Sequence, residues 1–380
     1  MAKVFRIIAA ALITMFGIAV LTYIGSQTNT NDYVEYWSAG KLFIHGDNPY
    51  SSSMIFALEK SRGLVNGEPL IMLNPPWALF MVAPLGFFPA TGALVLWIVA
   101  TAGSVLLSIF VLDVPPKHRT IAFLFAPVLA TLTMMQSSPF LLLGFSLFLR
   151  FHRSRPFLAG ASLLLMAIKP HLFLVFWAVV LVDCLYRRRF AILAGLATAL
   201  ALASAAPMLV VPHVWQDYLA LMHGAALGQN LFPTLPVLIR LWINPKLAWL
   251  ELVPAGMGMI WGVVFYWRNR HRWNWRQNGM LVMLVSVFTS PYGWVSDQAV
   301  LLPVVVSAAT GPIRRFSIEI LTVLNCAVLL VFCVSAYFRA WLPSAWLLWY
   351  LYAVAPNQDN DALPNIGPTV RENSLGGFSA

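Results

Sequence analysis

The chain has 380 residues, of which 60% are hydrophobic and only 10% are charged, and its mean hydropathy is +0.76. A soluble domain carries about 45–50% apolar and about 25% charged residues, so this composition excludes an ordinary soluble fold and predicts a membrane protein. The net charge of +10 comes from Lys and Arg in short clusters between apolar runs. That distribution is typical of membrane topology and argues against a nucleic-acid partner.

Apolar runs fill most of the chain, and a helix that crosses a membrane needs about 20 mostly apolar residues. Five runs are long enough to cross alone: 4–24, 91–112, 190–212, 246–267 and 316–336. Shorter runs lie between them, at 120–136, 138–151, 156–168, 171–186, 279–291, 298–311 and 341–355. Together they predict an all-α polytopic membrane protein, a bundle of about 10–13 transmembrane helices.

The shorter runs come in pairs that are interrupted by polar, proline-containing joints. The joints are Gln136-Ser137-Ser138-Pro139, Lys169-Pro170-His171 and Ser290-Pro291-Tyr292. Non-helical backbone at membrane depth is tolerated only where protein buries it or where it lines a wet cavity. We therefore expect these joints to form cavity walls.

The basic clusters fix the predicted orientation, because cytoplasmic loops carry an excess of Lys and Arg. With the N-terminus inside, the inner loops collect clusters such as 187–189, whereas many of the acids fall outside. Residues 1–355 then form one membrane domain with two long extracytoplasmic loops, 25–76 and 213–245. The polar tail 356–380 is predicted to be disordered and cytoplasmic.

The first outer loop contains two predicted helices, 31–44 and 53–62, with Asp32 at the start of the first. Asp32 can cap this helix, since Glu35 three residues later completes a capping-box pattern. Alternatively, Asp32 is a general base that removes a proton from a hydroxyl, and Glu35 is a substrate-binding residue. The two roles are separable, because Asn caps a helix about as well as Asp but cannot act as a base.

Lys169 and His171 form a second candidate pair. A Lys between two apolar runs is costly in a membrane and usually faces a cavity or a partner. A cation and an imidazole near the outer end of a helical hairpin suit a phosphate, and Pro170 interrupts the helix beside both. The alternative for Lys169 is snorkelling to the membrane interface.

The third joint leads to Tyr292, Trp294 and Asp297, two aromatic rings and a carboxylate that suit carbohydrate binding. An interfacial aromatic belt is the alternative for the rings, but it does not account for the acid. The second outer loop adds further candidates for the wall, with ordinary loop polarity as the alternative: His223, Gln229, Asn230 and Arg240.

Several motifs, in this order, resemble glycosyltransferase family 87. They are Asp-Tyr-x-x-Tyr-Trp-x-Ala-Gly from Asp32, Gly-Asp-Asn-Pro-Tyr at 46–50, Asn-Pro-Pro at 74–76, and the Lys-Pro-His and Ser-Pro-Tyr joints. The resemblance covers about residues 25–310. The family contains membrane enzymes of the GT-C class, including polyprenol-phosphate-mannose-dependent mannosyltransferases. The chain departs from many relatives at Gln136-Ser137-Ser138 and from some at Ser296-Asp297, which leaves the donor sugar open.

The resemblance implies a GT-C-like fold with its active site at the extracytoplasmic face of a bacterial inner membrane. It implies inverting transfer of a mannose-like hexose from a polyprenyl-phosphate sugar to a lipid or glycan hydroxyl. Asp32 matches the expected base, while Lys169, His171 and Arg240 are candidates to hold the phosphate. No cofactor and no obligatory metal are expected, although Asp297 near Asp32 could hold one.

The competing hypothesis is a transporter or flippase that moves lipid-linked sugars without transfer chemistry. Interrupted helices around a polar cavity also occur in secondary transporters. Against it, the polar groups gather at one face and not at the midplane, and the sequence shows no inverted repeat.

Overall fold

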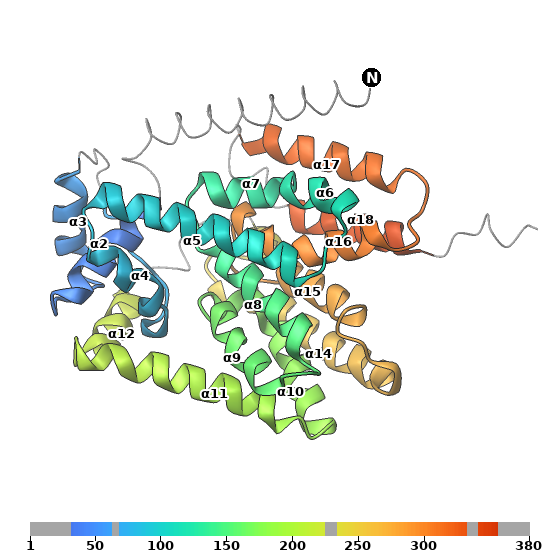
Figure 1. Ribbon diagram of the computed structural model, residues 1–380, viewed down its shortest axis with the longest axis horizontal. Helices are drawn as coiled ribbons and strands as arrows, with labels where there is room; N and C mark the ends of the chain where they lie inside the picture. The colour runs from blue at the N-terminus through green and yellow to red at the C-terminus, as the bar shows by residue number, and fades with distance from the viewer. Residues whose placement is uncertain (1–31, 63–67, 225–233, 333–340, 356–380) are drawn as a thin grey trace, which may run out of the picture.

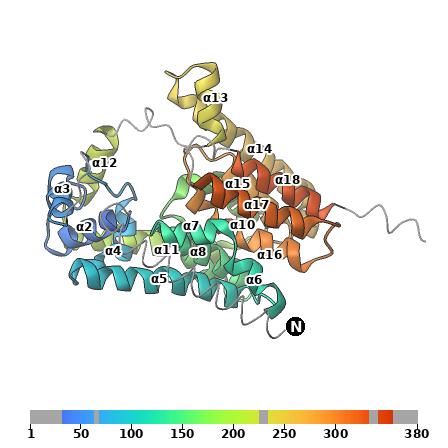
Figure 2. The same ribbon diagram turned by 90° about the horizontal axis from the view of Figure 1, so that it is seen from above.

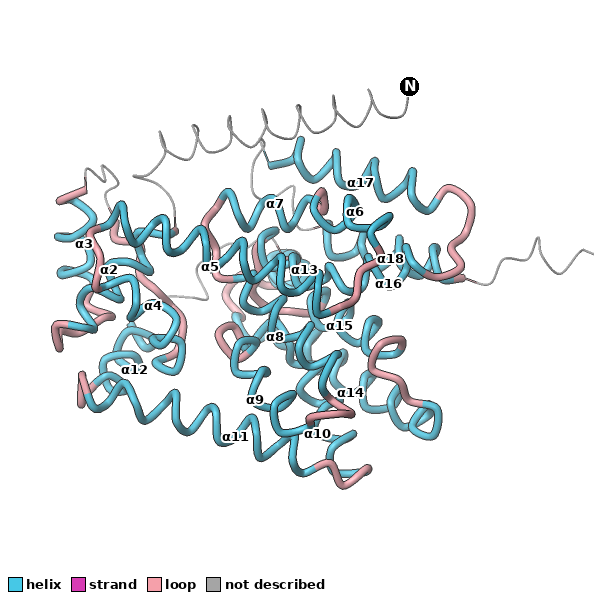
Figure 3. Tube along the Cα trace, in the orientation of Figure 1, coloured by secondary structure: helices cyan, strands magenta, loops and turns pink. Residues whose placement is uncertain are grey.

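In the computed structural model the described residues are 32–62, 68–224, 234–332 and 341–355. The predicted helix 4–24 and the predicted tail 356–380 lie outside them. Every regular element in the described part of the chain is a helix, as Figure 3 shows. This confirms the predicted all-α fold class.

The first outer loop folds into the two short helices that its sequence predicts, and a third helix, which follows the loop, packs against the first of them at the left of Figure 1. α2 and α4 cross so closely that a Cβ on Gly40 would lie 2.2 Å from the carbonyl oxygen of Val82. Only glycine allows backbones to approach to this distance. The elements are α2 (Tyr33–Ile44), α3 (Ser52–Lys60), the 3-10 turn η1 (Pro76–Ala78) and α4 (Leu79–Gly86).

Three helical stretches are long and apolar enough to cross a membrane, and they match three of the predicted spans. The first is α5 (Ala90–Val111). The second, Phe190–Leu209, consists of α11 (Phe190–Ala205) and the 3-10 turn η4 (Ala206–Leu209). The third, Ala248–Arg272, contains α14 (Leu252–Asn269). Most of their side chains are not buried, and apolar ones such as Val99, Leu202 and Ile260 are exposed. Lipid contact accounts for exposed apolar surface of this kind.

The shorter apolar runs form short helices, and several of them end at the predicted joints. In chain order they are α6 (Arg119–Phe123), α7 (Ala126–Thr133), α8 (Ser138–Phe151), α9 (Pro156–Met166), η3 (Pro170–Phe173) and α10 (Leu174–Tyr186). α17 (Ser317–Phe332) lies in the predicted full-length span 316–336, but among the described residues its apolar stretch, Ser317–Leu329, is shorter than a membrane-crossing helix. The other short helices further along the chain are α15 (Asn278–Phe288), η8 (Val295–Leu301), α16 (Leu302–Thr310) and α18 (Leu342–Val354). Proline stands in the first turn of most of them, where its missing N–H costs nothing.

The second outer loop contributes α12 (Val214–Gly224) and α13 (Leu235–Ile243). Figure 2 shows α13 at one edge of the molecule, next to the start of α14 and apart from α2 and α4. α12 instead lies beside the first outer loop, where the ring centroids of Tyr218 and Tyr50 are 5.3 Å apart, so the two helices of the second outer loop lie in different parts of the molecule.

The middle of the molecule is an aromatic cluster on α8. Phe148 packs edge-on against Phe176 of α10 and against Trp275, with ring centroids 5.4 Å and 5.0 Å away. Phe145, one turn earlier, also meets Phe176. This packing fixes α8 against α10, so the polar joints at the starts of both helices are held at one end of the same core.

Candidate active site

The joint before α8 presents three polar side chains. α7 ends at Thr133, and Met135 then adopts a left-handed conformation with φ of 57°, which turns the chain sharply. Gln136 follows, and its N–H donates to the carbonyl of Thr131 at 3.0 Å. α8 begins at Ser138, with Pro139 in its first turn. The turn places Gln136 and its two serine neighbours at the N-terminal end of α8.

The joint after α9 is capped by two side chains from the end of the first outer loop and the residue that follows it. Pro170 ends the helical hydrogen bonding of α9 and leaves backbone carbonyls without partners. The amide of Asn74 donates to the carbonyl of Ile168 at 3.0 Å, and the indole of Trp77 donates to that of Ala167 at 2.8 Å. These two bonds hold Lys169 in a buried position, with only 6% of its surface exposed.

The joint before α16 is closed by a carboxylate. Asp297, 1% exposed, lies in η8, and its Oδ2 accepts the backbone N–H of Trp294 at 2.9 Å. Ser290 donates to the carbonyl of Tyr292 at 2.5 Å, and the indole of Trp294 donates to the Tyr292 hydroxyl at 3.1 Å. The result is a compact turn that points the second carboxylate oxygen away from its own backbone.

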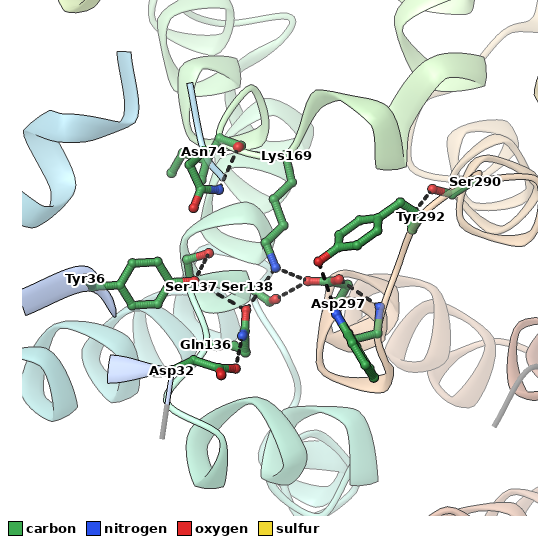
Figure 4. A network of polar contacts seen from close by, with 12 residues as sticks. Asp32, Tyr36, Asn74, Gln136, Ser137, Ser138, Lys169, Ser290, Tyr292 and Asp297 are labelled. Carbon is green, nitrogen blue, oxygen red and sulfur yellow. Dashed lines mark hydrogen bonds and ion pairs between the residues drawn. The ribbon is translucent and has the colours of Figure 1, made fainter. Parts of the chain in front are cut away.

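The three joints meet in one buried network, shown in Figure 4. Lys169 Nζ forms an ion pair with Asp297 Oδ1 at 2.7 Å and donates to Gln136 Oε1 at 2.9 Å. Ser138 donates to the same oxygen of Asp297 at 2.7 Å. The amide nitrogen of Gln136 donates to Oδ2 of Asp32. A continuous chain of hydrogen bonds thus runs from Asp32 through Gln136 and Lys169 to Asp297.

Asp32 does not cap α2, because its side chain makes no capping hydrogen bond. It is half-buried at the start of the helix. Burial raises the pKa of its carboxyl above the usual 3.8, while the hydrogen bond from Gln136 and the charge of Lys169 act in the opposite direction. A carboxylate in such a place holds a proton more readily than a solvated one, which is a property that a general base requires.

Glu35 and Tyr36 line the next turn of α2. Burial, together with the nearby charge of Asp32, raises the pKa of Glu35 well above its usual value. The Tyr36 hydroxyl lies 3.4 Å from both Gln136 Oε1 and Ser137 Oγ. Tyr36 therefore joins the first turn of α2 to the network.

His171 and Tyr292 lie next to the network. Their rings meet edge-on with centroids 4.9 Å apart. His171 Nε2 is buried and has no hydrogen-bond partner among the described residues. An unpaired imidazole nitrogen beside a buried Lys is a group that a ligand can satisfy.

Arg240 lies elsewhere. It is 3% exposed on α13 and forms an ion pair with Glu251 at 2.7 Å. α13 lies apart from α2 in Figure 2. His223 is exposed at the end of α12, and Gln229 and Asn230 lie outside the described residues.

Gln136 was not among the residues that the sequence singled out for binding or catalysis. The signal for it was the polar joint itself, which predicted a cavity wall without distinguishing its members. Its role in the geometry is that of a bridge, because its amide donates toward Asp32 while its carbonyl accepts from Lys169. A primary amide suits this role because it has a donor and an acceptor on one planar group.

The model of glycosyltransferase family 87 matches residues 72–291, which is more than half of the chain. The chain belongs to glycosyltransferase family 87. This family 87 protein is therefore a glycosyltransferase. No curated protein and no solved structure matched it.

The family match includes two members of the network, Gln136 and Lys169, and the joint that ends at Pro291. It is shorter than the resemblance read from the motifs, since it begins after Asp32 and ends before Asp297. The assignment of these two carboxylates in this glycosyltransferase rests on the geometry of its own chain. The described residues contain no group of three or more His, Cys, Asp or Glu side chains that could hold a metal ion.

Proposed function

We propose that the protein transfers a mannose-like hexose from a polyprenyl-phosphate sugar to a hydroxyl of a lipid or glycan, with inversion, at the extracytoplasmic face of a bacterial plasma membrane. The observation that carries this proposal is the chain Asp32–Gln136–Lys169–Asp297, which joins a candidate base to a buried cation. Transfer from a sugar phosphate needs both groups, one for the acceptor proton and one for the leaving phosphate.

The proposed transfer is a single nucleophilic displacement at the anomeric carbon. Asp32 takes the proton of the acceptor hydroxyl as its oxygen attacks the anomeric carbon. The bond between that carbon and the phosphate oxygen breaks, and its electron pair leaves with the polyprenyl phosphate. A phosphate leaves without protonation, so no second carboxylic acid is required, in contrast to glycoside hydrolysis.

Lys169 is our candidate for holding the phosphate. A Lys ammonium has three N–H donors, and two of them serve Gln136 and Asp297. The third is available for a phosphate oxygen, and His171 Nε2 is a second group without a partner among the described residues. Fixed positive charge at the leaving group lowers the barrier because it stabilises the charge that develops there.

The acceptor is proposed to enter beside Asp32. A cavity of about 140 Å³ is lined by Tyr33, Trp37 and Arg62 from the first outer loop and by Ala90, Thr91 and Leu94 at the start of α5. Tyr33 is the direct neighbour of Asp32, and the aromatic walls suit a sugar or lipid group. No metal ion is needed in this scheme.

The test is a transfer assay with purified protein, a polyprenyl-phosphate mannose and membrane-lipid acceptors. The wild type should form product and Asp32→Asn should not, whereas Asp217→Asn, which removes an acid from α12, should keep full activity. Full turnover by Asp32→Asn would refute the base assignment. A protein that transfers nothing from any donor but moves intact lipid-linked sugar across vesicles would instead be a flippase.

A further inference from the structure

A basic pocket lies at the opposite end of the core from the network. It has a volume of about 450 Å³ and is lined by His152, Arg153, Pro156, Arg188, Arg189 and Ala191. α8 begins at the network and ends at this pocket, and its 14 residues span about 20 Å. The pocket therefore plays no direct part in the proposed transfer chemistry.

The pocket carries three arginines and no acid. None of these arginines makes a side-chain hydrogen bond or ion pair with another described residue. Two other arginines of this end do form ion pairs, Arg187 with Asp183 at 2.9 Å and Arg150 with Asp113 at 2.5 Å. The chain thus neutralises some of its inner cations and leaves those of the pocket unpaired.

Two helices begin at the pocket, which adds to its positive potential. α9 starts at Pro156 and α11 at Phe190, and both N-terminal ends carry partial positive charge. They cross closely, because a Cβ on Gly160 would lie 1.9 Å from the carbonyl oxygen of Ile192. Cations are unfavourable at helix N-termini. The positive-inside rule explains why basic residues lie at this end of the protein, but it does not explain why they lie beside the N-terminal ends of two helices.

Arg188 occupies a position where glycine would be the easier residue. Its φ is 54°, in the left-handed region. Its N–H donates to Leu185 at 3.3 Å, and that of Arg189 donates to Cys184 at 2.8 Å. This is the hydrogen-bond pattern of a Schellman cap, whose left-handed residue is usually Gly. The guanidinium therefore stands at the pocket in spite of a backbone preference against it.

His152 adds a buried imidazole to the wall, with only 5% of its surface exposed. Its Nδ1 faces the carbonyl of Leu149 at 3.1 Å and so carries the hydrogen. Nε2 makes no hydrogen bond within the described residues. Burial, with Arg153 and Arg189 nearby, lowers the pKa of His152 to about 4, so the empty pocket holds a neutral ring. A bound anion would favour its protonation and gain a further donor.

Apolar side chains surround this charged wall. Phe157 at the start of α9 and Phe190 at the start of α11 are 46% and 55% exposed, and Leu185 is 53% exposed. Such apolar surface would not contribute to the binding of a small inorganic anion. It would contribute to the binding of a lipid, because the acyl chains can contact these side chains while the phosphate reaches the arginines.

We propose that this pocket binds the phosphate of an anionic phospholipid from the leaflet on the basic side of the protein. The arginines donate to the phosphate oxygens, and the exposed phenylalanines contact the acyl chains. By the positive-inside rule this leaflet is the cytoplasmic one. The lipid would tie α8, α9 and α11 together from the side opposite the network.

The test measures the melting temperature of the full-length protein in neutral detergent with added phosphatidylglycerol, phosphatidylcholine or inorganic phosphate. Phosphatidylglycerol should raise the melting temperature by several degrees, and the other two should leave it unchanged. Arg188→Gly should keep or raise the lipid-free melting temperature, because glycine suits the left-handed position. The same variant should need about tenfold more phosphatidylglycerol for half the shift.

Arg272→Gln is the matched control, since it removes an exposed arginine from the same end but outside the pocket, and it should respond to lipid as the wild type does. Arg189→Gln provides a second pocket variant if Arg188→Gly folds poorly. The proposal is overturned if Arg272→Gln weakens the lipid effect as much as the pocket variants do, or if phosphatidylcholine is equally effective. An equal shift with inorganic phosphate alone would make the pocket a free-anion site and would also overturn it.

Discussion

Two carboxylates of this glycosyltransferase, Asp183 and Asp32, lie in opposite halves of the fold and have very different surroundings. Asp183 accepts from the hydroxyl of Tyr266, from the indole of Trp275 and from Arg187, each at 2.9 Å. Asp32 has one hydrogen bond among the described residues, from the neutral amide of Gln136. The first acid has three partners and joins α10 to α14 and to the turn before α15. The second acid can still accept a hydrogen bond from a substrate. This difference separates a structural acid from a candidate base.

The largest expected effect comes from Asp32→Asn. Loss of a general base should lower kcat by about 10²–10⁴-fold. The melting temperature should not fall, because burial already disfavours the charged form of this side chain. Initial rates and thermal unfolding of the same preparation check both statements. If the variant loses activity only in proportion to its loss of folded protein, Asp32 has a structural role like that of Asp183.

Asp183→Asn should show the reverse pattern. Removing one partner of a buried ion pair costs about 3–5 kcal/mol, and we expect the lower figure because Arg187 is partly exposed. Turnover per folded molecule should stay at the wild-type level. Thermal unfolding and specific activity normalised to folded protein measure the two effects. Lost turnover with unchanged unfolding would show that Asp183 has a functional role.

Gln136→Met keeps the length of the side chain but removes both hydrogen bonds of the bridge. Without the bridge the base and the cation are less well positioned, so kcat should fall by about tenfold or more, which corresponds to about 1.4 kcal/mol in the activation free energy. Gln136→Glu is an informative companion, because it keeps the acceptor for Lys169 and loses the donor to Asp32. Equal rates for wild type and Gln136→Met would show that the bridge does not position the base.

The smallest effect is a pH dependence. Asp32 must be ionised to act as a base, so kcat/KM should rise as pH increases through a pKa above 3.8. Folding stability should change in the opposite direction. A raised pKa means that the folded state favours protonated Asp32, so the stability that this group contributes is lost as pH rises. Gln136→Met should move the acid limb to higher pH, because it removes a hydrogen bond that lowers this pKa. The pH–rate profiles of both proteins test the shift, and identical acid limbs would contradict it.

The sequence predicted the local structure of this membrane protein well, for a physical reason. The run 138–151 became α8 with the same ends, because Pro139 can only begin a helix and the apolar residues continue without interruption. The interrupted pairs of short helices were predicted correctly on the same grounds. The predicted run 120–136 divides into α6 and α7 just before Pro127.

Contacts between distant residues were beyond such reasoning. Asp32 and Gln136 are 104 positions apart, and nothing in either segment alone indicates that they meet. The same is true of the ion pair between Lys169 and Asp297, 128 positions apart. Arg240 was predicted to bind substrate because it is a cation in an outer loop. Its ion pair with Glu251 depends on the turn between α13 and α14, which the composition of the loop does not encode.

The caps on α9 have a consequence for how the protein is made. Asn74 and Trp77 leave the ribosome about 90 residues before the carbonyls of Ile168 and Ala167 that they bind. The first outer loop, which ends with Asn74 and its two neighbouring prolines, can therefore make this contact only after α8 and α9 have been synthesised. Although it is synthesised early, this loop can complete its fold only late, and Lys169 becomes fixed in place at that same moment of biogenesis.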